Sequence, residues 1–239
     1  MRIAIVSDIH GNLTAFEAVL KDLRQTSPDL IFHGGDLADA GASPVEIVDR
    51  IRELGWAGVV GNTDEMLAMP ETLEEFASQS KAPASLWSVV REMAAATRSA
   101  LGEERIAWLR GLRRIQKYGP VALVHASPES RWKAPMPEAT DAELGAVYSP
   151  LGHAVVVYGH IHRSFVRSVS NMLVINTGSV SLSYDGDRRA AYLLLDDSEA
   201  TIRRVEYDVD REIRALAGCG LPHSDWIAKT IESGRPQMP

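Results

Sequence analysis

The chain begins MRIAIVSDIHGN (residues 1–12), an apolar and β-branched run that ends in a cluster of polar side chains. Met1–Val6 has the composition of a buried strand, and Asp8, His10 and Asn12 follow it at once. In open α/β sheets, ligands bind beyond the carboxyl ends of the strands. The opening residues therefore predict an α/β sheet with a polar site at that edge.

The same arrangement, a short apolar run followed by polar residues, recurs along the chain. Leu30–Phe32 precedes His33-Gly34-Gly35-Asp36, Ala57–Val60 precedes Gly61-Asn62-Thr63-Asp64, Val121–Val124 precedes His125, and Val155–Tyr158 precedes Gly159-His160-Ile161-His162. Asp, Asn and His side chains gathered at one sheet edge form a nitrogen and oxygen site that suits transition metals, with room for two ions. Each motif alone is weak, and the ordered series carries the prediction.

The ordered series D-x-H, G-D, G-N-x-D, H and G-H-x-H resembles the calcineurin-like metallophosphoesterase family, over residues 1 to about 178. The G-N-x-D variant is similar to that of the small bacterial and archaeal phosphodiesterases of this family. The resemblance implies an α/β fold, a four-layer α/β/β/α sandwich of two mixed β-sheets flanked by helices. It also implies a binuclear metal-dependent phosphoesterase that acts on a small phosphate ester.

The resemblance also assigns roles to individual residues. One metal site would consist of Asp8, His10, Asp36 and His162, and the other of Asp36, Asn62, His125 and His160. Asp36, which would bridge the two ions, is expected to be catalytically important together with Asn62 and His125. The cofactors would be two divalent transition-metal ions, and manganese, zinc, iron, cobalt and nickel all remain open.

Two such ions can hold a bridging water whose pKa falls from about 15.7 toward about 7, which creates a hydroxide that attacks phosphorus. By formal counting, two dications with this hydroxide, Asp8 and Asp36 leave a charge of about +1, which matches a phosphodiester. The family's usual His after Gly-Asn is Thr63 here, and threonine supplies neither charge nor an acidic proton. We therefore expect a phosphodiesterase.

Several alternatives remain open at this stage. A phosphomonoesterase, a protein phosphatase or a dinucleoside polyphosphate hydrolase would use the same site, and a non-catalytic scaffold would use the same fold. Asp64 is either a residue that orients a ligand histidine or a helix cap. Arg131, in a loop after His125, either contacts the substrate or is a solvated loop residue.

Composition bounds the class of protein. The 239 residues are 45% hydrophobic and carry a net charge of −7, which favours one globular domain over residues 1–239 and argues against long nucleic acid as a partner. The single cysteine, Cys219, fits a reducing cytoplasm. The apolar start is too short for a signal peptide, and no segment approaches a membrane span of about 20 apolar residues.

Periodicity predicts the remaining elements. Helices are expected after Asn12 and after Ser43, and a helical insertion at about 66–112 is either a packed helix pair, which we favour, or a substrate cap. Short alternating strands follow at 115–118, 121–125, 165–169, 173–176, 190–195 and 201–207. The last predicted helix is capped by Asp208 and ends near Gly218.

Overall fold

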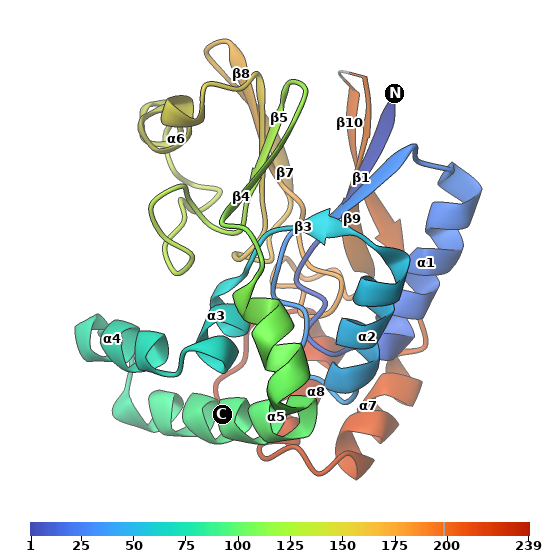
Figure 1. The fold of residues 1–239 in the computed structure, drawn as a ribbon, viewed down its shortest axis with the longest axis vertical. Coiled ribbons are helices and arrows are strands. Elements are labelled where there is room, and N and C mark those ends of the chain that lie inside the picture. The colour runs from blue at the N-terminus through green and yellow to red at the C-terminus, as the bar shows by residue number, and fades with distance from the viewer. Residues whose placement is uncertain (198) are drawn as a thin grey trace.

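Two mixed sheets lie side by side in the computed structural model, which describes residues 1–197 and 199–239 (Figure 1). The first sheet has the order β10-β9-β1-β2-β3. Its strands are β1 (Arg2–Val6), β2 (Leu30–His33), β3 (Ala57–Gly58), β9 (Ala190–Asp196) and β10 (Glu199–Val205). The strands β1, β2 and β3 are parallel, as the helical crossovers between them require, and β9 and β10 are antiparallel.

The second sheet has the order β4-β5-β6-β8-β7. Its strands are β4 (Ile115–Tyr118), β5 (Val121–Val124), β6 (Val155–Tyr158), β7 (Phe165–Val169) and β8 (Met172–Asn176). The central strands β5, β6 and β8 are parallel, whereas β4 and β7 pair antiparallel at the edges. Every strand predicted from the sequence is therefore present, within one or two residues at most ends.

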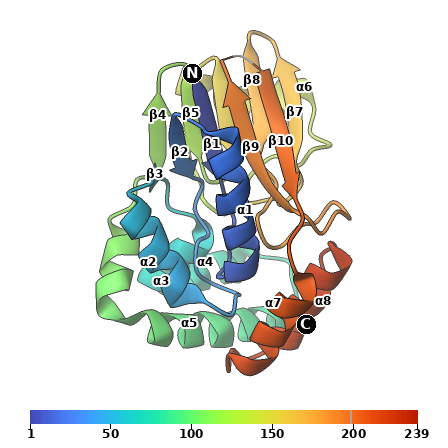
Figure 2. The same ribbon diagram turned by 90° about the vertical axis from the view of Figure 1, so that its right-hand side faces the viewer.

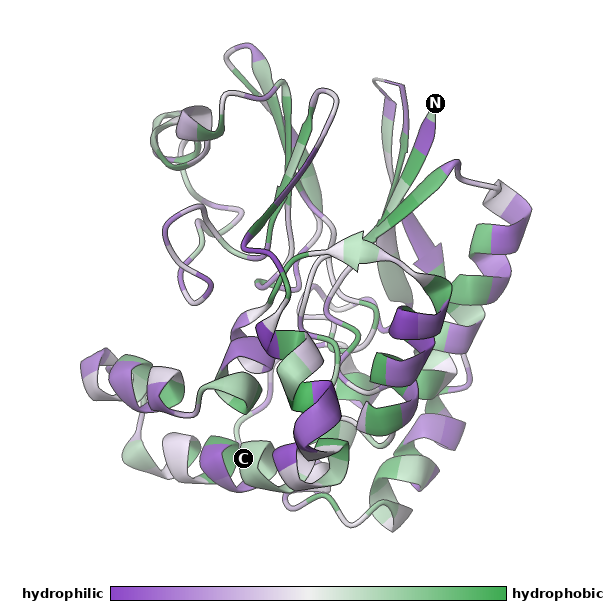
Figure 3. Ribbon diagram, in the orientation of Figure 1, coloured by the Kyte–Doolittle hydropathy of each residue, from purple (hydrophilic) through white to green (hydrophobic). Residues whose placement is uncertain are grey.

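Alternation along the strands produces the layers. In β1, Ile3 and Ile5 point into a buried cluster between the two sheets, while Ala4 and Val6 face the helices on the other side. Helices α1 (Leu13–Thr26) and α2 (Pro44–Leu54) cover that outer face. Helix α6 (Asp141–Tyr148), followed by the short 3₁₀ turn Ser149–Leu151, covers the second sheet. The predicted four-layer sandwich is confirmed (Figures 1 and 3).

The predicted helix starts follow from capping. The Asn12 side chain accepts a hydrogen bond of 2.9 Å from the Ala15 N–H, which caps α1. Pro44 occupies the first turn of α2, and Gly55 ends that helix in the left-handed conformation. These helices lie between consecutive parallel strands, so their N-termini begin close to the edge where the candidate ligands lie.

The segment expected to be a helical insertion forms α3 (Asn62–Ala68), α4 (Glu71–Gln79) and α5 (Ala84–Arg110). Helix α5 is interrupted at Gly102, whose φ of 70° and ψ of 166° are not helical. Figure 2 shows the first part of α5 crossing beneath the lower ends of the strands. The insertion therefore passes below the sheet edge that carries the polar motifs.

The C-terminal region holds two helices, α7 (Val209–Gly218) and α8 (Ser224–Ser233). The predicted α7 is confirmed, and the Asp208 side chain caps it by accepting from the Arg211 N–H. The prediction that α7 is the last helix is wrong, because α8 follows it. Trp226, Ile227 and Ile231 recur at helical spacing, which is the signal that the sequence offered for α8. Among the described residues, no helix is long and apolar enough to cross a membrane.

Candidate metal centre

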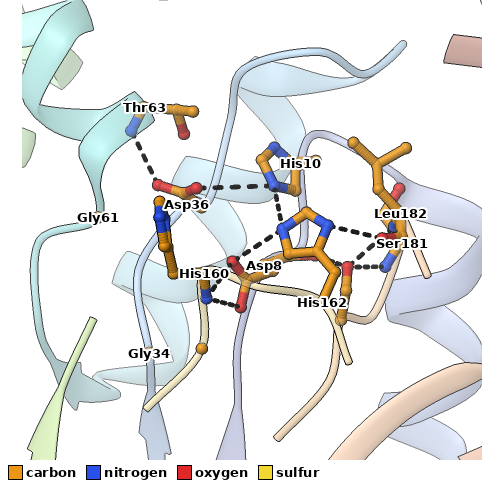
Figure 4. A network of polar contacts seen from close by, with 12 residues as sticks. Asp8, His10, Gly34, Asp36, Gly61, Thr63, His160, His162, Ser181 and Leu182 are labelled. Atoms are coloured by element: carbon orange, nitrogen blue, oxygen red, sulfur yellow. Dashed lines mark hydrogen bonds and ion pairs between the residues drawn. The ribbon is translucent and has the colours of Figure 1, made fainter. Parts of the chain in front are cut away.

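The seven candidate ligands converge at the carboxyl ends of five strands. Asp8 and His10 follow β1, Asp36 follows β2, Asn62 begins α3 after β3, His125 follows β5, and His160 and His162 follow β6. These strands belong to both sheets, so the site lies where the two sheets meet, and Figure 4 shows five of these side chains together. The sequence expectation that the motifs gather at one sheet edge agrees with this placement.

Backbone strain is concentrated in this cluster. Ten described non-glycine residues have positive φ, and five of them are candidate ligands: Asp8, His10, Asp36, His160 and His162. Such a conformation is uncommon outside glycine and persists where the surrounding structure enforces it, often at functional sites. The consecutive turns at His160 and His162 aim the two rings at different neighbours, which a regular strand would not do.

The first group of ligand atoms is compact and buried. One ligand atom each from Asp8, His10, Asp36 and His162 lies within 4.8 Å of the other three. The His162 Nε2 is 3.1 Å from Asp8 Oδ1 and 3.3 Å from His10 Nε2. All four side chains are almost inaccessible to solvent. Four donors with this spacing could hold one metal ion.

The second group adjoins the first. The Asn62 Oδ1 is 2.9 Å from His125 Nε2 and 2.8 Å from His160 Nδ1. Asp36 lies between the groups, since its Oδ2 is 3.4 Å from His125 Nε2 and 3.7 Å from His10 Nε2. Its carboxylate thus lies close to a histidine ring of each group.

Hydrogen bonds to the backbone fix which ring nitrogen is free. The His10 Nδ1 lies 3.0 Å from the Asp39 carbonyl oxygen, and the His162 Nδ1 lies 2.6 Å from the Leu182 carbonyl oxygen. A carbonyl only accepts, so each Nδ1 donates, and each neutral ring presents an unprotonated Nε2. These two lone pairs face each other at 3.3 Å. A cation between them would turn this repulsion into coordination, so the donor set fits a metal.

Charges in the cluster stabilise one another. Burial raises the pKa of Asp36, but the imidazoles of His125 and His10 outweigh this and hold it far below its usual value. Burial lowers the pKa of His125, but the carboxylates of Asp36 and Asp8 raise it to about 9. A proton on His125 therefore takes the place that a metal cation would occupy. Metal binding at this group would displace that proton.

Asp64 supports the ligand loops through the backbone. Its carboxylate accepts hydrogen bonds from the N–H groups of Asp36 (2.8 Å), Leu37 (2.9 Å) and Gly61 (2.9 Å). No described histidine ring is hydrogen-bonded to it. Asp64 is therefore the third residue of α3 and holds the loops after β2 and β3 together, which supports the helix-cap alternative over the contact with a ligand histidine.

The two residues named for substrate contact behave differently. Thr63 lies beside the cluster, and its N–H donates to Asp36 Oδ1 at 2.9 Å. Arg131 forms an ion pair with the buried Glu65, so its charge is already neutralised there. His33, which is not among the candidate ligands, is fully buried and neither ring nitrogen has a hydrogen-bond partner.

Close approach of the backbone explains two of the glycines. A Cβ on Gly61 would collide with the Asp36 carboxylate, and one on Gly159 would collide with Asp8. Ser179 donates from Oγ to the Asp8 carbonyl oxygen at 2.8 Å. The sequence analysis did not identify Glu65, whose buried carboxylate pairs with Arg131 and accepts from Trp132. Its position directly after Asp64 was the only signal for it in the sequence.

Comparisons with known proteins agree with this geometry. Residues 1–199 match the family model described as the calcineurin-like phosphoesterase superfamily domain. The chain belongs to this superfamily. It is 31% identical to the uncharacterized protein MJ0912 of Methanocaldococcus jannaschii, over 98% of each chain.

Solved structures of this superfamily fold resemble the whole chain. The metallophosphoesterase from Sphaerobacter thermophilus superposes with a TM-score of 0.78 at 26% identity, covering 98% of this chain and 99% of that chain. The hypothetical protein PH1004 from Pyrococcus horikoshii OT3 superposes with a TM-score of 0.84 at 18% identity, covering 99% of each chain. The superfamily and fold inferred from the motifs are therefore confirmed.

Proposed function

We propose that this calcineurin-like phosphoesterase is a binuclear metal-dependent enzyme that prefers phosphodiesters. The observation that carries the metal requirement is the pair of facing Nε2 lone pairs of His10 and His162, each fixed by a backbone carbonyl. With both rings neutral, these two nitrogens and Asp8 Oδ1, which lies 3.1 Å from His162 Nε2, are all acceptors, and a shared cation would relieve the repulsion between them. The position of Asp36 between the two groups supports its role as the residue shared by two ions.

In this proposal Asp8, His10, Asp36 and His162 hold one ion, and Asp36, Asn62, His125 and His160 hold the other. The ions, when bound, would neutralise phosphoryl oxygens and activate water for attack. The role of the chain is to fix this geometry. Asp36 Oδ1 accepts from the Thr63 N–H, which leaves its Oδ2 oriented toward the histidines. The substrate is proposed to be a small phosphate ester.

The preference for diesters follows from the missing positive charge. Thr63 is uncharged, and Arg131 is paired with Glu65. The cavity beside the site contains neither lysine nor arginine among its described lining residues. A monoester dianion needs an additional cation or a proton donor more than a diester monoanion does. These residues therefore favour a diester.

Two measurements test the proposal. Metal analysis of protein purified without chelator should give about two transition-metal ions per chain, whereas a replete preparation holding one would rule out the binuclear site. The kcat/KM should be higher for bis(para-nitrophenyl) phosphate than for para-nitrophenyl phosphate with manganese, zinc, cobalt or nickel. Faster cleavage of the monoester with every metal would contradict the diester preference.

Asp36→Asn tests the shared ligand directly. Removing a charge that both ions share should lower kcat at least 10²-fold and reduce bound metal, while circular dichroism stays that of the folded protein. Glu53→Gln, on the exposed end of α2, is the matched control and should change neither property. An Asp36→Asn enzyme with full activity and two ions would disprove the bridging role.

A further inference from the structure

A cavity of about 180 Å³ adjoins the proposed metal centre. His10 and Asn62 form its metal side, and its other walls carry four aromatic residues, Trp87, Trp132, Tyr184 and Trp226. Three of the five tryptophans of the chain therefore line one small cavity. They come from α5, from the loop after β5 and from α8, so the fold brings distant segments together here. We refer to this cavity as the aromatic pocket.

The walls of the aromatic pocket are held in place by their neighbours. Phe76 stacks on Trp132 with ring centroids 4.7 Å apart and meets Trp87 edge-on at 5.7 Å. The Trp132 Nε1 donates to the buried Glu65 at 3.0 Å. The Trp226 Nε1 donates to the Gln237 carbonyl oxygen at 2.8 Å. A ligand entering the pocket would therefore meet preorganised surfaces and would not have to order them.

The pocket is also joined to the candidate ligands. The ring of Tyr184 lies 4.6 Å from that of His162, and Thr63 lines the pocket next to Asn62. Three polar atoms of lining residues, Asp39 Oδ1, Thr63 Oγ1 and Trp87 Nε1, are buried without a hydrogen-bond partner. Unpaired buried polar groups are uncommon in native proteins and often mark a functional site. All three could bond to polar substituents on a bound ring.

The size of the pocket limits its occupant. An apolar cavity of about 150 Å³ accommodates one benzene molecule. A pocket of about 180 Å³ is thus large enough for one substituted ring. Its aromatic walls, the Asp39 carboxyl group and the absence of lysine and arginine among the described lining residues suit an apolar ring more than an anionic group.

We propose that the aromatic pocket binds the organic group of the substrate and that this group is a single aromatic or similarly compact apolar ring. The inference rests on the proposed phosphoesterase function, because the phosphorus must lie at the metal centre for the ring to enter the pocket. The substrate class would then be aryl or arylalkyl phosphoesters.

Binding of simple phosphonates to the metal-loaded protein tests the pocket without turnover. Phenylphosphonate and benzylphosphonate should each quench tryptophan fluorescence, and the tighter of the two should bind about 10- to 100-fold more strongly than methylphosphonate, as expected for burying one ring. Equal dissociation constants for the aryl and methyl probes would overturn the proposal.

Two variants on α5 locate the effect. Val90→Trp places a bulky side chain in the pocket, and should abolish the preference for the aryl probe over methylphosphonate. Ser88→Trp, on the exposed side of the same helix, adds the same side chain outside the pocket and should retain the preference. If Val90→Trp is folded and keeps the preference, the ring binds elsewhere and the proposal fails.

Trp226→Leu provides an independent test, because it enlarges the pocket. Naphthylphosphonate should then bind at least about 5-fold more tightly than to the wild type, and an unchanged affinity would count against the pocket. Hydrolysis of methyl para-nitrophenyl phosphate distinguishes failure of the proposed phosphoesterase function from failure of the aromatic pocket. If no diester or monoester is cleaved with any metal, the proposed function fails, whereas cleavage without any aryl preference in binding refutes the pocket alone.

Discussion

Replacing Asp64 by asparagine should weaken metal binding at the proposed centre although it replaces none of the proposed ligands. Asp64 Oδ2 accepts from the Asp36 and Gly61 N–H groups, and Oδ1 accepts from Leu37. An asparagine keeps one acceptor oxygen and turns the other position into an NH₂ donor. At least one of these buried N–H groups then loses its partner and faces another donor.

The magnitude follows from the hydrogen bonds. A buried unsatisfied polar group costs about 1–3 kcal/mol, and bonds to a charged acceptor are stronger than neutral ones. We expect Asp64→Asn to lower the free energy of unfolding of the metal-free protein by about 2–4 kcal/mol. Because the loops carrying Asp36 and Asn62 lose their common anchor, metal affinity should fall about 10- to 100-fold.

The assay combines urea unfolding of the metal-free protein with a chelator competition for metal affinity, both at pH 8. Burial raises the pKa of Asp64 to about 6, so the wild-type carboxylate is ionised at that pH. Glu143→Gln is the matched control, because Glu143 is also the third residue of a helix and its carboxylate accepts from the Thr140 N–H at an exposed position. Glu143→Gln should lower the free energy of unfolding by less than about 1 kcal/mol and leave metal affinity unchanged. Equal effects of the two variants on both measurements would refute the reasoning.

Two further outcomes are expected. Thr63→His should raise kcat/KM for an alkyl monoester relative to an aryl diester by at least about 10-fold, because positioned acids contribute about 10²–10⁴-fold, and wild-type protein that already prefers the alkyl monoester would contradict this. His33 is buried without partners, and burial lowers its pKa from 6.5 to about 4. The unfolded chain therefore binds a proton at higher pH than the folded one, so the free energy of unfolding should fall by about 3 kcal/mol from this group as pH drops from 6.5 to 4. His33→Leu should flatten that dependence in urea titrations, and an unchanged slope would show that another group causes it.

Most of the fold could be predicted because its signals are local. The alternation of Ile3 and Ile5 with Ala4 and Val6 sorts residues to the two faces of β1, and Asn12 and Pro44 mark helix starts. The candidate ligands could be located for the same reason, since each follows an apolar run within a few residues. The parallel strands then bring these ends to one edge.

The missed features depend on contacts between distant segments. Arg131 pairs with Glu65, 66 residues away, and nothing near either residue indicates the partner. The role of Asp64 depends on backbone N–H groups of another loop, 27 and 28 residues away. Helix α8 was overlooked although its apolar spacing was visible, because Asp208 and Gly218 suggested that the last helix had already ended.

The helical insertion shows why the two interpretations of it need not exclude each other. Beyond the break at Gly102, Ile106 and Leu109 are fully buried in the core that includes α1 and α2. Before the break, Trp87 and Val90 are only partly buried and line the aromatic pocket. Trp87 and Val90 thus border the pocket, whereas Ile106 and Leu109 contribute to stability through packing. Substitutions at Trp87 and Val90 should therefore alter specificity at little cost in stability, whereas those at Ile106 and Leu109, like those at the buried Met93 and Leu101 before the break, should do the reverse.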